Sequence, residues 1–255
     1  KQTAKDLGLP TVPGSSGGVE TIEEARKVAE ETGYPVLIKA AAGGGGKGMK
    51  VAQTADDLDE AYRLARSEAK AAFGNDEVYM EKYLDRPRHI EVQLLGDTHG
   101  NAVHFGERDC SLQRRHQKVI EEAPSPGLND NERKEIGALA ADVVAKMGYR
   151  GVGTIEFLYE NGQFYFIEMN TRLQIEHTIS EMITGIDLVR EQIRVAAGLP
   201  LSYSQKDIKF NGHSIECRIN AENPDTFLPS PGKVQNFHAA GGLGVRVDSA
   251  IYEGY

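Results

Sequence analysis

The sequence predicts an α+β protein, and two observations favour that class. Strand-like runs follow one another across short turns, as at 89–95 and 101–107, and again on either side of Asn161-Gly162. Helical segments are interspersed with these runs, without the regular strand–helix–strand alternation of a doubly wound sheet. A chain of 255 residues that is 40% hydrophobic and 26% charged can form one large soluble domain or two smaller ones.

The first elements predict a connector and a small domain. Residues 1–10 are typical of the end of a helix and a proline-containing connector, which we expect to close a preceding domain. Thr21 begins a helix as a capping box with Glu24, and Gly33 ends it. The rest of the small domain, predicted at residues 11–83, comprises strands at 34–39, 49–53 and 78–84 and a helix that Thr54 and Asp57 cap.

The larger region, predicted at residues 84–255, holds most of the strands. It contains the strands at 89–95 and 101–107, a helix at 130–147, the hairpin around Asn161-Gly162, a helix at 186–197 and a strand at 213–221. The segment from Ser230 to Tyr255 is Gly-rich and is expected to be β-like. The sequence has no internal repeat or low-complexity tract.

Charge and apolar distribution argue against several function classes. The formal net charge of −9 argues against general binding to nucleic acid or to anionic membranes, and no apolar run approaches membrane-spanning length. Cys110 and Cys217 lack a metal-type spacing, so free thiols in a reducing compartment, the cytoplasm, are expected. The first residues have neither an initiator Met nor the apolar core of a signal peptide, as expected for the middle of a longer protein.

The segment 151–177 carries the densest set of candidate ligands. Glu156, Glu168 and Asn170 offer the carboxylate and amide oxygens that Mg2+ or Mn2+ takes. A two-residue turn would place the glutamates on opposite faces, so we predict a three-residue turn in which Gly162 has a positive φ and Glu156 pairs with Glu168. Two carboxylates directly opposite repel each other unless a cation neutralises them. The alternative is two glutamates on a solvated face.

This register also predicts which side chains share a face of the hairpin. One face is then wholly apolar, with Ile155, Phe157, Tyr165, Ile167 and Met169. The other face carries Thr154, Glu156, Leu158, Phe164, Phe166, Glu168 and Asn170. A clean apolar face supports the register because a one-residue slip exchanges the faces of a strand.

The glycine run Gly43–Gly48 is a candidate phosphate-binding loop. Consecutive glycines expose backbone N–H groups and let the chain approach an anion closely. Lys39, at the end of the preceding strand, can reach the same phosphates. The run lacks the Lys-Ser/Thr of a Walker A loop and the following helix of a dinucleotide fingerprint. It suits a lid that closes over a nucleotide, whereas the alternative is a flexible hairpin turn.

Two further segments carry weaker signals. Glu81-Lys82-Tyr83-Leu84 lies between the two regions, where backbone groups can bond an adenine edge with Leu84 against the base. The segment 109–118 is basic; continuous strand alternation would place Gln113, Arg115 and Gln117 on one face and Arg114, His116 and Lys118 on the other. Such a face suits an anion site. A nucleic-acid patch is the alternative, which the net acidity and the lack of interleaved aromatics disfavour.

Arg172, Gln174 and Glu176 alternate directly after the hairpin. A guanidinium and an amide suit a small oxyanion, and Glu176 can act as a base toward it. A structural salt bridge between Arg172 and Glu176 is the alternative. Arg218 follows the apolar residues of its predicted strand and needs a partner there, which is either structural or a ligand.

These motifs together resemble the ATP-grasp core of the biotin carboxylases. The resemblance covers nearly the whole chain and is carried, in the family's order, by AAAGGGGKGM, EKYLDRPRHIEVQ, DCSLQRRHQKVIEEAPSP, FIEMNTRLQIEH and ECRINAENPDTFLPSPGKV. It implies an ATP-grasp fold with a small lid domain (11–83), a larger antiparallel-sheet domain continuing into the start of the C-terminal region (84–255), and an N-terminal Rossmann-like domain outside this sequence.

The resemblance implies a two-step reaction. ATP phosphorylates bicarbonate to carboxyphosphate, whose CO2 then carboxylates biotin on a carrier protein. By motif, the ATP-binding residues are Lys39, Gly44, Gly45, Gly46, Glu81, Lys82, Leu84, His89, Gln113, His116 and Leu158. The metal ligands, for two Mg2+ or Mn2+ ions, are Glu156, Glu168 and Asn170. The bicarbonate site comprises Lys118, Arg172, Gln174 and the backbone at Ile175. Glu176 is the base, with Lys118, Arg172 and Arg218 as further catalytic residues.

The resemblance also implies partners and leaves rivals open. It implies a biotin carboxyl carrier protein, a carboxyltransferase and a homodimer, and the ECRINAE segment is most similar to the acetyl-CoA carboxylase branch. Two departures from the family are Ile175, where Val is usual, and Thr178, where Pro is usual. One rival is another ATP-grasp ligase that joins a carboxylate to an amine. The other is an incomplete nucleotide-binding fragment, since the family has a further ATP-contacting lysine before residue 1.

Overall fold

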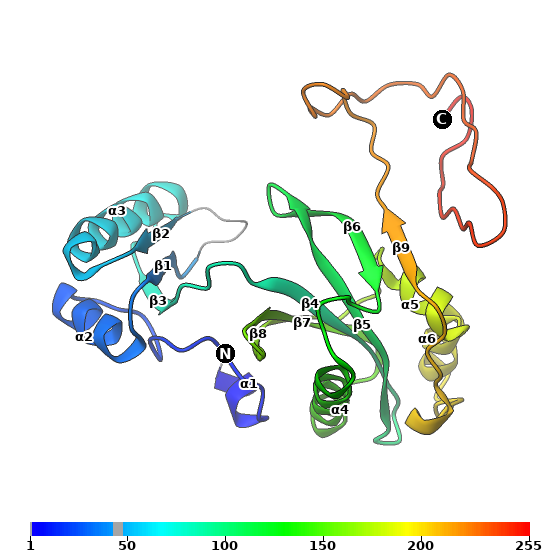
Figure 1. Ribbon diagram of the computed structural model, residues 1–255, viewed down its shortest axis with the longest axis horizontal. Helices are drawn as coiled ribbons and strands as arrows, with labels where there is room; N and C mark the ends of the chain where they lie inside the picture. The colour runs from blue at the N-terminus through cyan, green and yellow to red at the C-terminus, as the bar shows by residue number, and fades with distance from the viewer. Residues whose placement is uncertain (1, 43–47) are drawn as a thin grey trace. The chain divides into compact units, whose positions relative to one another are not determined.

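The computed structural model describes residues 2–42 and 48–255 (Figure 1). The chain divides into two compact units, Lys1–Cys217 and Arg218–Tyr255. Within the described part of the larger unit, the strands form a three-stranded sheet and a six-stranded sheet. Both sheets are antiparallel and carry helices, which confirms the predicted α+β class.

The small sheet has the strand order β2-β1-β3, with β1 at Val36–Ala40, β2 at Met49–Ala52 and β3 at Val78–Lys82. Helices α2 (Ile22–Thr32) and α3 (Ala55–Phe73) pack on it. Both predicted capping boxes are present, at the starts of these two helices. The core between helices and sheet is apolar and closely packed, with Ile38, Leu58 and Met80 fully buried. The predicted domain boundary at 83/84 stays a prediction.

The large sheet has the order β8-β7-β4-β5-β6-β9. Its strands are β4 (Arg88–Gly96), β5 (Ala102–Arg114), β6 (Gln117–Ala123), β7 (Gly151–Glu160), β8 (Gln163–Asn170) and β9 (Ser214–Cys217). Its helices are α4 (Asp130–Lys146), α5 (His177–Thr184) and α6 (Leu188–Ala196). The short helices α1 (Gln2–Asp6) and η1 (Gln205–Asp207) complete the described elements.

The two faces of the large sheet bury different side chains. Helix α4 packs on β4 and β5, where Val92 and Leu94 join the core around Phe157. Leu95 and Phe105 belong to a separate cluster with the α6 residues. Alternate residues of β4 therefore serve opposite faces, as strand geometry requires.

The hairpin of β7 and β8 has the predicted glutamate pair but reaches it differently. Glu156 lies directly opposite Glu168, as expected. The turn has two residues, however, because Asn161 and Gly162 both have positive φ (52° and 78°) and Glu160 pairs with Gln163. Phe157 pairs with Phe166, so the extra residue is a β-bulge at Ile167.

The bulge makes the predicted faces wrong on the turn side of it. Because each strand alternates, one unpaired residue exchanges the faces of everything between the bulge and the turn. Phe164 and Phe166 consequently pack against Phe157, with ring centroids 6.0 and 6.5 Å away. Ile167 is 40% exposed instead of lying in the core.

Three other expectations differ from the structure. The segment 109–118 is not one strand, since Arg115 and His116 have positive φ (51° and 64°) and turn β5 into β6. Helix α5 was not predicted, because it is only eight residues long. The segment after Cys217 forms no strand, although an isolated bridge joins Glu222 to Pro229. Among the described residues, no helix combines the length and apolarity needed to cross a membrane.

Candidate active site

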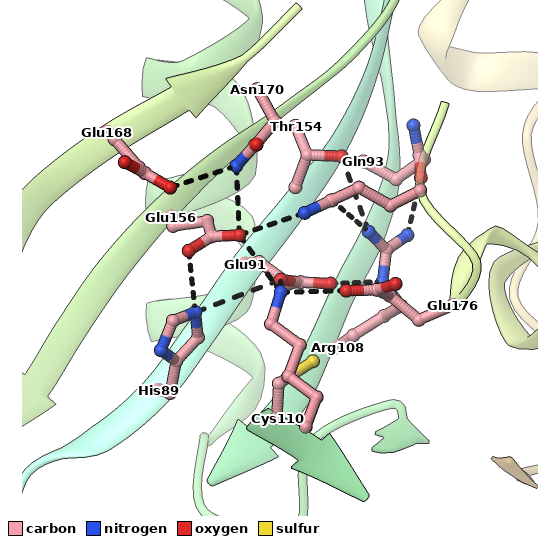
Figure 2. A network of polar contacts seen from close by, with 12 residues as sticks. His89, Glu91, Gln93, Arg108, Cys110, Thr154, Glu156, Glu168, Asn170 and Glu176 are labelled. Carbon is pink, nitrogen blue, oxygen red and sulfur yellow. Dashed lines mark hydrogen bonds and ion pairs between the residues drawn. The ribbon is translucent and has the colours of Figure 1, made fainter. Parts of the chain in front are cut away.

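One face of the large sheet gathers charged side chains that almost no solvent reaches. Alternate positions on β4, β5 and β7 place these residues side by side, and Figure 2 shows their contacts. The strand residues are Glu91, Gln93, Arg108, Cys110, Thr154 and Glu156. Glu91 and Arg108 are fully buried, and Glu156 is 5% exposed. Buried charges of this kind must be paired.

Lys118 is the cation on which three carboxylates converge. It lies at the start of β6, opposite Gln113 across the hairpin. Its Nζ donates to Glu176 Oε1 at 2.7 Å, to Glu156 Oε1 at 2.9 Å and to Glu91 Oε2. Burial alone would lower the pKa of Lys118, but the three carboxylates outweigh it and raise that pKa well above its usual value. Lys118 is therefore a permanent positive charge.

Glu156 lies between that lysine and the predicted ATP ligand His89. Its Oε1 accepts hydrogen bonds from Lys118, from Asn170 at 3.0 Å and from Gln174 at 2.9 Å, and its Oε2 lies 2.9 Å from His89 Nε2. Burial would raise the pKa of Glu156, yet the contacts with His89 and Lys118 hold it far below its usual range. The carboxylate is thus ionised at any physiological pH.

Glu176 is positioned by the start of α5, of which it is the N-cap residue. Its side chain is 3% exposed and contacts Lys118. Burial would raise the pKa of Glu176, but Lys118 and Arg108 lower it, so the carboxylate is ionised and able to accept a proton. Arg172, for which a structural salt bridge with Glu176 was the alternative, donates from Nη2 to Asn170 Oδ1 at 3.3 Å.

Two of the residues predicted to bind an oxyanion are shielded from solvent, and two are exposed. Gln174 is 6% exposed and Lys118 has a side chain 14% exposed. Arg172 and Ile175 are exposed. Gln174 and Lys118 share Glu156 as an acceptor, so an anion that reached Lys118 would meet the Gln174 amide as well. These four residues lie where β8 ends and α5 begins, since Lys118 bonds Glu176 at the start of α5 and the other three are in the connecting segment.

The predicted metal ligands fit a hard divalent cation by their donors. Two carboxylates face each other across β7 and β8, and Asn170 Nδ2 bonds both, at 3.0 Å to Glu156 and 3.4 Å to Glu168. Because amide oxygen and nitrogen are assigned from hydrogen-bond partners, a half-turn of this side chain would turn Oδ1 toward the glutamates. Three carboxylates, those of Glu91, Glu156 and Glu176, surround the two cations Lys118 and Arg108. The set therefore has one excess negative charge, which favours a bound cation.

A cavity of about 430 Å³ lies between the small sheet and the β7–β8 hairpin. Of the predicted ATP residues, Lys39, Glu81 and Leu158 line it. Lys39 Nζ donates to Glu81 Oε2 at 2.6 Å and lies 5.8 Å from the centre of the Tyr79 ring. An apolar wall with one lysine is typical of a nucleotide or other anionic ligand site.

Other predicted ATP residues lie outside that lining. Lys82 Nζ donates to the carbonyl oxygens of Gly33 and Tyr34, and its backbone N–H donates to Pro13. Leu84 is half-buried and His116 is exposed at the β5–β6 turn. Gln113 Nε2 lies 3.3 Å from His89 Nδ1, so that pair is brought together beside Glu156. Gly44, Gly45 and Gly46 lie outside the described residues.

Sequence reasoning missed two parts of the site. The segment Ser15–Gly18 also lines the cavity, and the Gly-Ser-Ser-Gly-Gly run at 14–18 to which it belongs was a signal that could have been used. Gly14 lets it lie against β3, since a Cβ there would be 2.1 Å from the Met80 carbonyl oxygen. Arg108 was also missed, because its partners come from strands far apart in sequence. Arg218 belongs to the second unit, so its predicted role stays a prediction.

Comparisons with known proteins agree with the fold. Residues 1–204 match the family described as "Carbamoyl-phosphate synthase L chain, ATP binding domain". Residues 216–255 match the family described as "Biotin carboxylase C-terminal domain". The chain is 61% identical over 252 residues to biotin carboxylase of Haemophilus influenzae, covering 98% of this chain and 56% of that protein. It is 54% identical to a subunit of pyruvate carboxylase from Methanothermobacter thermautotrophicus, covering 100% of this chain and 52% of that protein.

Solved structures show the same likeness. One is the biotin carboxylase–β-γ-ATP complex of Campylobacter jejuni, with a TM-score of 0.89 and 53% identity, covering 100% of this chain and 57% of that one. Another is the biotin carboxylase domain dimer of Hydrogenobacter thermophilus 2-oxoglutarate carboxylase with MgADP, ADP and bicarbonate, with a TM-score of 0.88, 51% identity and the same coverage. The chain thus spans little more than half the length of the relatives it matches.

Proposed function

The chain belongs to the biotin carboxylase family of ATP-grasp proteins, and we propose that it carries the site that phosphorylates bicarbonate with ATP and passes CO2 to biotin. One observation supports this most strongly. A lysine held by three buried carboxylates, one of them an ionised base, stands beside an amide donor and a pair of metal-type glutamates. A permanent cation next to a base suits an anionic substrate that must lose a proton.

The first step joins bicarbonate to the γ-phosphorus of ATP. Lys118 and Gln174 would hold the bicarbonate oxygens, with Arg172 and the Ile175 backbone closing the exposed side. Glu176 would take the bicarbonate proton, so that a bicarbonate oxygen attacks phosphorus and the bond to ADP breaks. The product is carboxyphosphate. Because these donors are fixed before the substrate binds, they need no reorganisation as charge develops.

The second step transfers CO2 to biotin. Carboxyphosphate breaks into CO2 and phosphate, the released phosphate would take the proton of biotin N1′, and a bond forms between that nitrogen and CO2. A fixed cation would stabilise the enolate-like charge that builds on the biotin ring, which is the role proposed for Arg218. Biotin is then the carried substrate, not a resident cofactor.

Mg2+ or Mn2+ would be held by Glu156, Glu168 and Asn170, with two ions expected. When bound, such ions would neutralise the phosphate oxygens and align them with the attacking group. Lys39 and Glu81 would serve the nucleotide on the cavity side. The lid glycines are proposed to cover the phosphates.

The proposed partners follow from the chemistry. Carboxybiotin must reach an acceptor, so a carrier protein and a carboxyltransferase are required, and we propose a homodimer for the intact protein. The solved relatives include a dimeric domain. Relatives named for pyruvate and for 2-oxoglutarate are nearly as similar as the biotin carboxylases, so the acetyl-CoA carboxylase branch stays a prediction, as does a cytoplasmic location.

The function is tested by ADP release with bicarbonate and free biotin varied independently. The expected result is ADP release that requires bicarbonate and rises with biotin. A Glu176→Gln variant should lose at least about 100-fold in rate, the usual scale for a general base, and still bind MgADP. ADP release that needs an amine instead of bicarbonate would assign another ATP-grasp ligase. Nucleotide binding without turnover would assign the incomplete fragment.

A further inference from the structure

The guanidinium of Arg108 is completely buried. It donates hydrogen bonds to five side chains from β4, β7, α5 and the segment before α5. Its Nε donates to Glu91 Oε1 at 2.7 Å and its Nη1 to Gln93 and to Ser180 Oγ at 3.0 Å. Its Nη2 donates to Thr154 Oγ1 and to Gln174 Oε1, both at 3.3 Å.

This set of partners exceeds what charge balance requires. Burial would lower the pKa of Arg108, but the nearby carboxylates, Glu91 first and also Glu176, outweigh it and keep that pKa above its ordinary value. Of the five hydrogen-bond partners, the four other than Glu91 are neutral. An arginine presents five donors in a rigid plane and no acceptor, so it fixes the orientation of each neutral group that contacts it.

The consequence is clearest for Gln174. Arg108 can only donate, so the Gln174 amide must turn its oxygen toward the guanidinium. Its NH2 group is thereby turned the other way, where Nε2 donates to Glu156 Oε1 at 2.9 Å. The two neighbours of Gln174, a pure donor and an ionised pure acceptor, allow one orientation of the amide.

The second consequence passes through Glu91. One oxygen of that carboxylate accepts from Arg108 and the other from Lys118. Arg108 therefore fixes the rotamer of the carboxylate that anchors Lys118. Of the proposed bicarbonate donors, Gln174 contacts this buried arginine directly and Lys118 is linked to it through Glu91.

We infer that Arg108 is a positioning residue that presets the donor groups of the proposed bicarbonate site, by locking the Gln174 amide with its oxygen toward the guanidinium and its NH2 toward Glu156, and by holding Lys118 through Glu91. This inference rests on the proposed function. We expect nucleotide binding to change less than bicarbonate binding, because Lys39 and Glu81, two of the proposed nucleotide residues, line the separate cavity.

The test compares Arg108→Lys with a matched control, Arg133→Lys. Lysine keeps the charge beside Glu91 but cannot reach the neutral partners together. Arg133 is a second shielded arginine, with its side chain 19% exposed, that bonds Glu107 at 2.7 Å and two backbone carbonyls. Glu107 immediately precedes Arg108 on β5, so its side chain faces away from the site.

In bicarbonate-dependent ADP release, Arg108→Lys should raise the KM for bicarbonate about tenfold or more, a change that corresponds to about 1.4 kcal/mol. The KM for ATP should stay within about twofold of its value in the parent chain. Arg133→Lys should leave both constants unchanged even if it lowers the Tm. Unchanged constants in Arg108→Lys, or equal increases in both, would overturn the inference. If Arg108→Lys does not fold, the Thr154→Val/Ser180→Ala double variant should shift the same KM in the same direction, and no shift would overturn it.

A second readout separates this inference from the proposed function. The side-chain amide of Gln174 should give a sharp 1H–15N pair that exchanges slowly with water, because both ends are bonded. Arg108→Lys should broaden it or speed its exchange, and Arg133→Lys should not. If ADP release proves independent of bicarbonate, the proposed function fails, and this resonance alone still decides whether Arg108 positions Gln174.

Discussion

Lys118 is the residue on which the charges of the site converge. Three carboxylates with side chains at most 7% exposed share its ammonium group, and two of them, Glu156 and Glu176, have lowered pKa values partly because of it. Lys118 therefore balances the buried negative charge of the site even without a substrate. Removing it leaves several buried negative charges without their common partner.

We predict that Lys118→Met abolishes bicarbonate-dependent ADP release and lowers stability by about 3–5 kcal/mol, the cost of breaking a buried ion pair. The pKa of Glu176 should rise in the variant because its largest source of stabilisation is gone. Carbon-13 NMR of the glutamate carboxyls and urea unfolding measure the two effects. A variant as stable as the parent would show that solvent, not the lysine, balances these carboxylates.

His104 predicts a pH dependence that is separate from the site. Its ring is 6.2 Å from Phe210, centroid to centroid, and a Cβ on Gly137 would lie 2.6 Å from it. Burial lowers the pKa of His104 from 6.5 to about 4. Between these values the unfolded chain binds a proton that the folded chain does not, so stability is complete above pH 6.5 and falls as pH drops toward 4.

The total loss is about 3 kcal/mol. Urea unfolding between pH 7 and pH 5, above the range where most carboxylates titrate, should show the decline in the parent chain. His104→Gln should remove most of that slope. If the slope persists unchanged in the variant, other groups are responsible for it.

Among the elements, the β7–β8 hairpin shows what strand periodicity can and cannot predict. The pairing of Glu156 with Glu168 could be predicted from the sequence, because both are carboxylates that suit the same metal ion. The position of the extra residue was not, since a bulge at Ile167 and a longer turn give the same glutamate pairing. The backbone pairing of Glu160 with Gln163 and the packing of Phe164 and Phe166 on Phe157 distinguish them.

We predict that Glu168→Gln stabilises the hairpin when no divalent cation is present, by about 0.2–1 kcal/mol, because like charges directly opposite are unfavourable. Adding Mg2+ should then raise the Tm of the parent chain but not that of the variant. A variant that loses stability without Mg2+ would contradict the view that these carboxylates repel each other.

The β5–β6 hairpin offers a test of backbone strain. Arg115 and His116 both adopt positive φ, which costs an ordinary residue about 1 kcal/mol. His116→Gly should therefore raise the unfolding free energy by about that amount, measured by urea denaturation, with Gln117→Gly as a control that should not. A loss of stability in His116→Gly would mean that the histidine side chain contributes contacts that outweigh the strain.

For the whole molecule, local signals predicted the elements well and non-local ones poorly. Both capping boxes, most strands of the two sheets and the charged residues after the hairpin follow from neighbours in the sequence, whereas β6 and α5 were not predicted. Arg108 does not, because its role depends on β4, β5 and β7 being adjacent and on α5 crossing their face. A fully buried arginine has no sequence signature until the strand order is known.

The cavity shows the same limit. Lys39, Glu81 and Leu158 come from two sheets. The segments of Lys39 and Glu81 were assigned to a nucleotide from their own residues, Leu158 was assigned only through the family resemblance, and Ser15–Gly18 escaped notice. The structure brings all of them to one cavity of about 430 Å³. The chain matches relatives about twice its length, and activity of these 255 residues is therefore a question for experiment.

The central claim is that bicarbonate itself is phosphorylated at this site. Oxygen-18 bicarbonate tests it directly, because attack by a bicarbonate oxygen on the γ-phosphorus leaves that oxygen in the released phosphate. We predict one 18O in phosphate for each ADP formed, and loss of the transfer in Glu176→Gln. ADP formed at the same rate with no 18O in phosphate would mean that water is the attacking group, and would contradict the account.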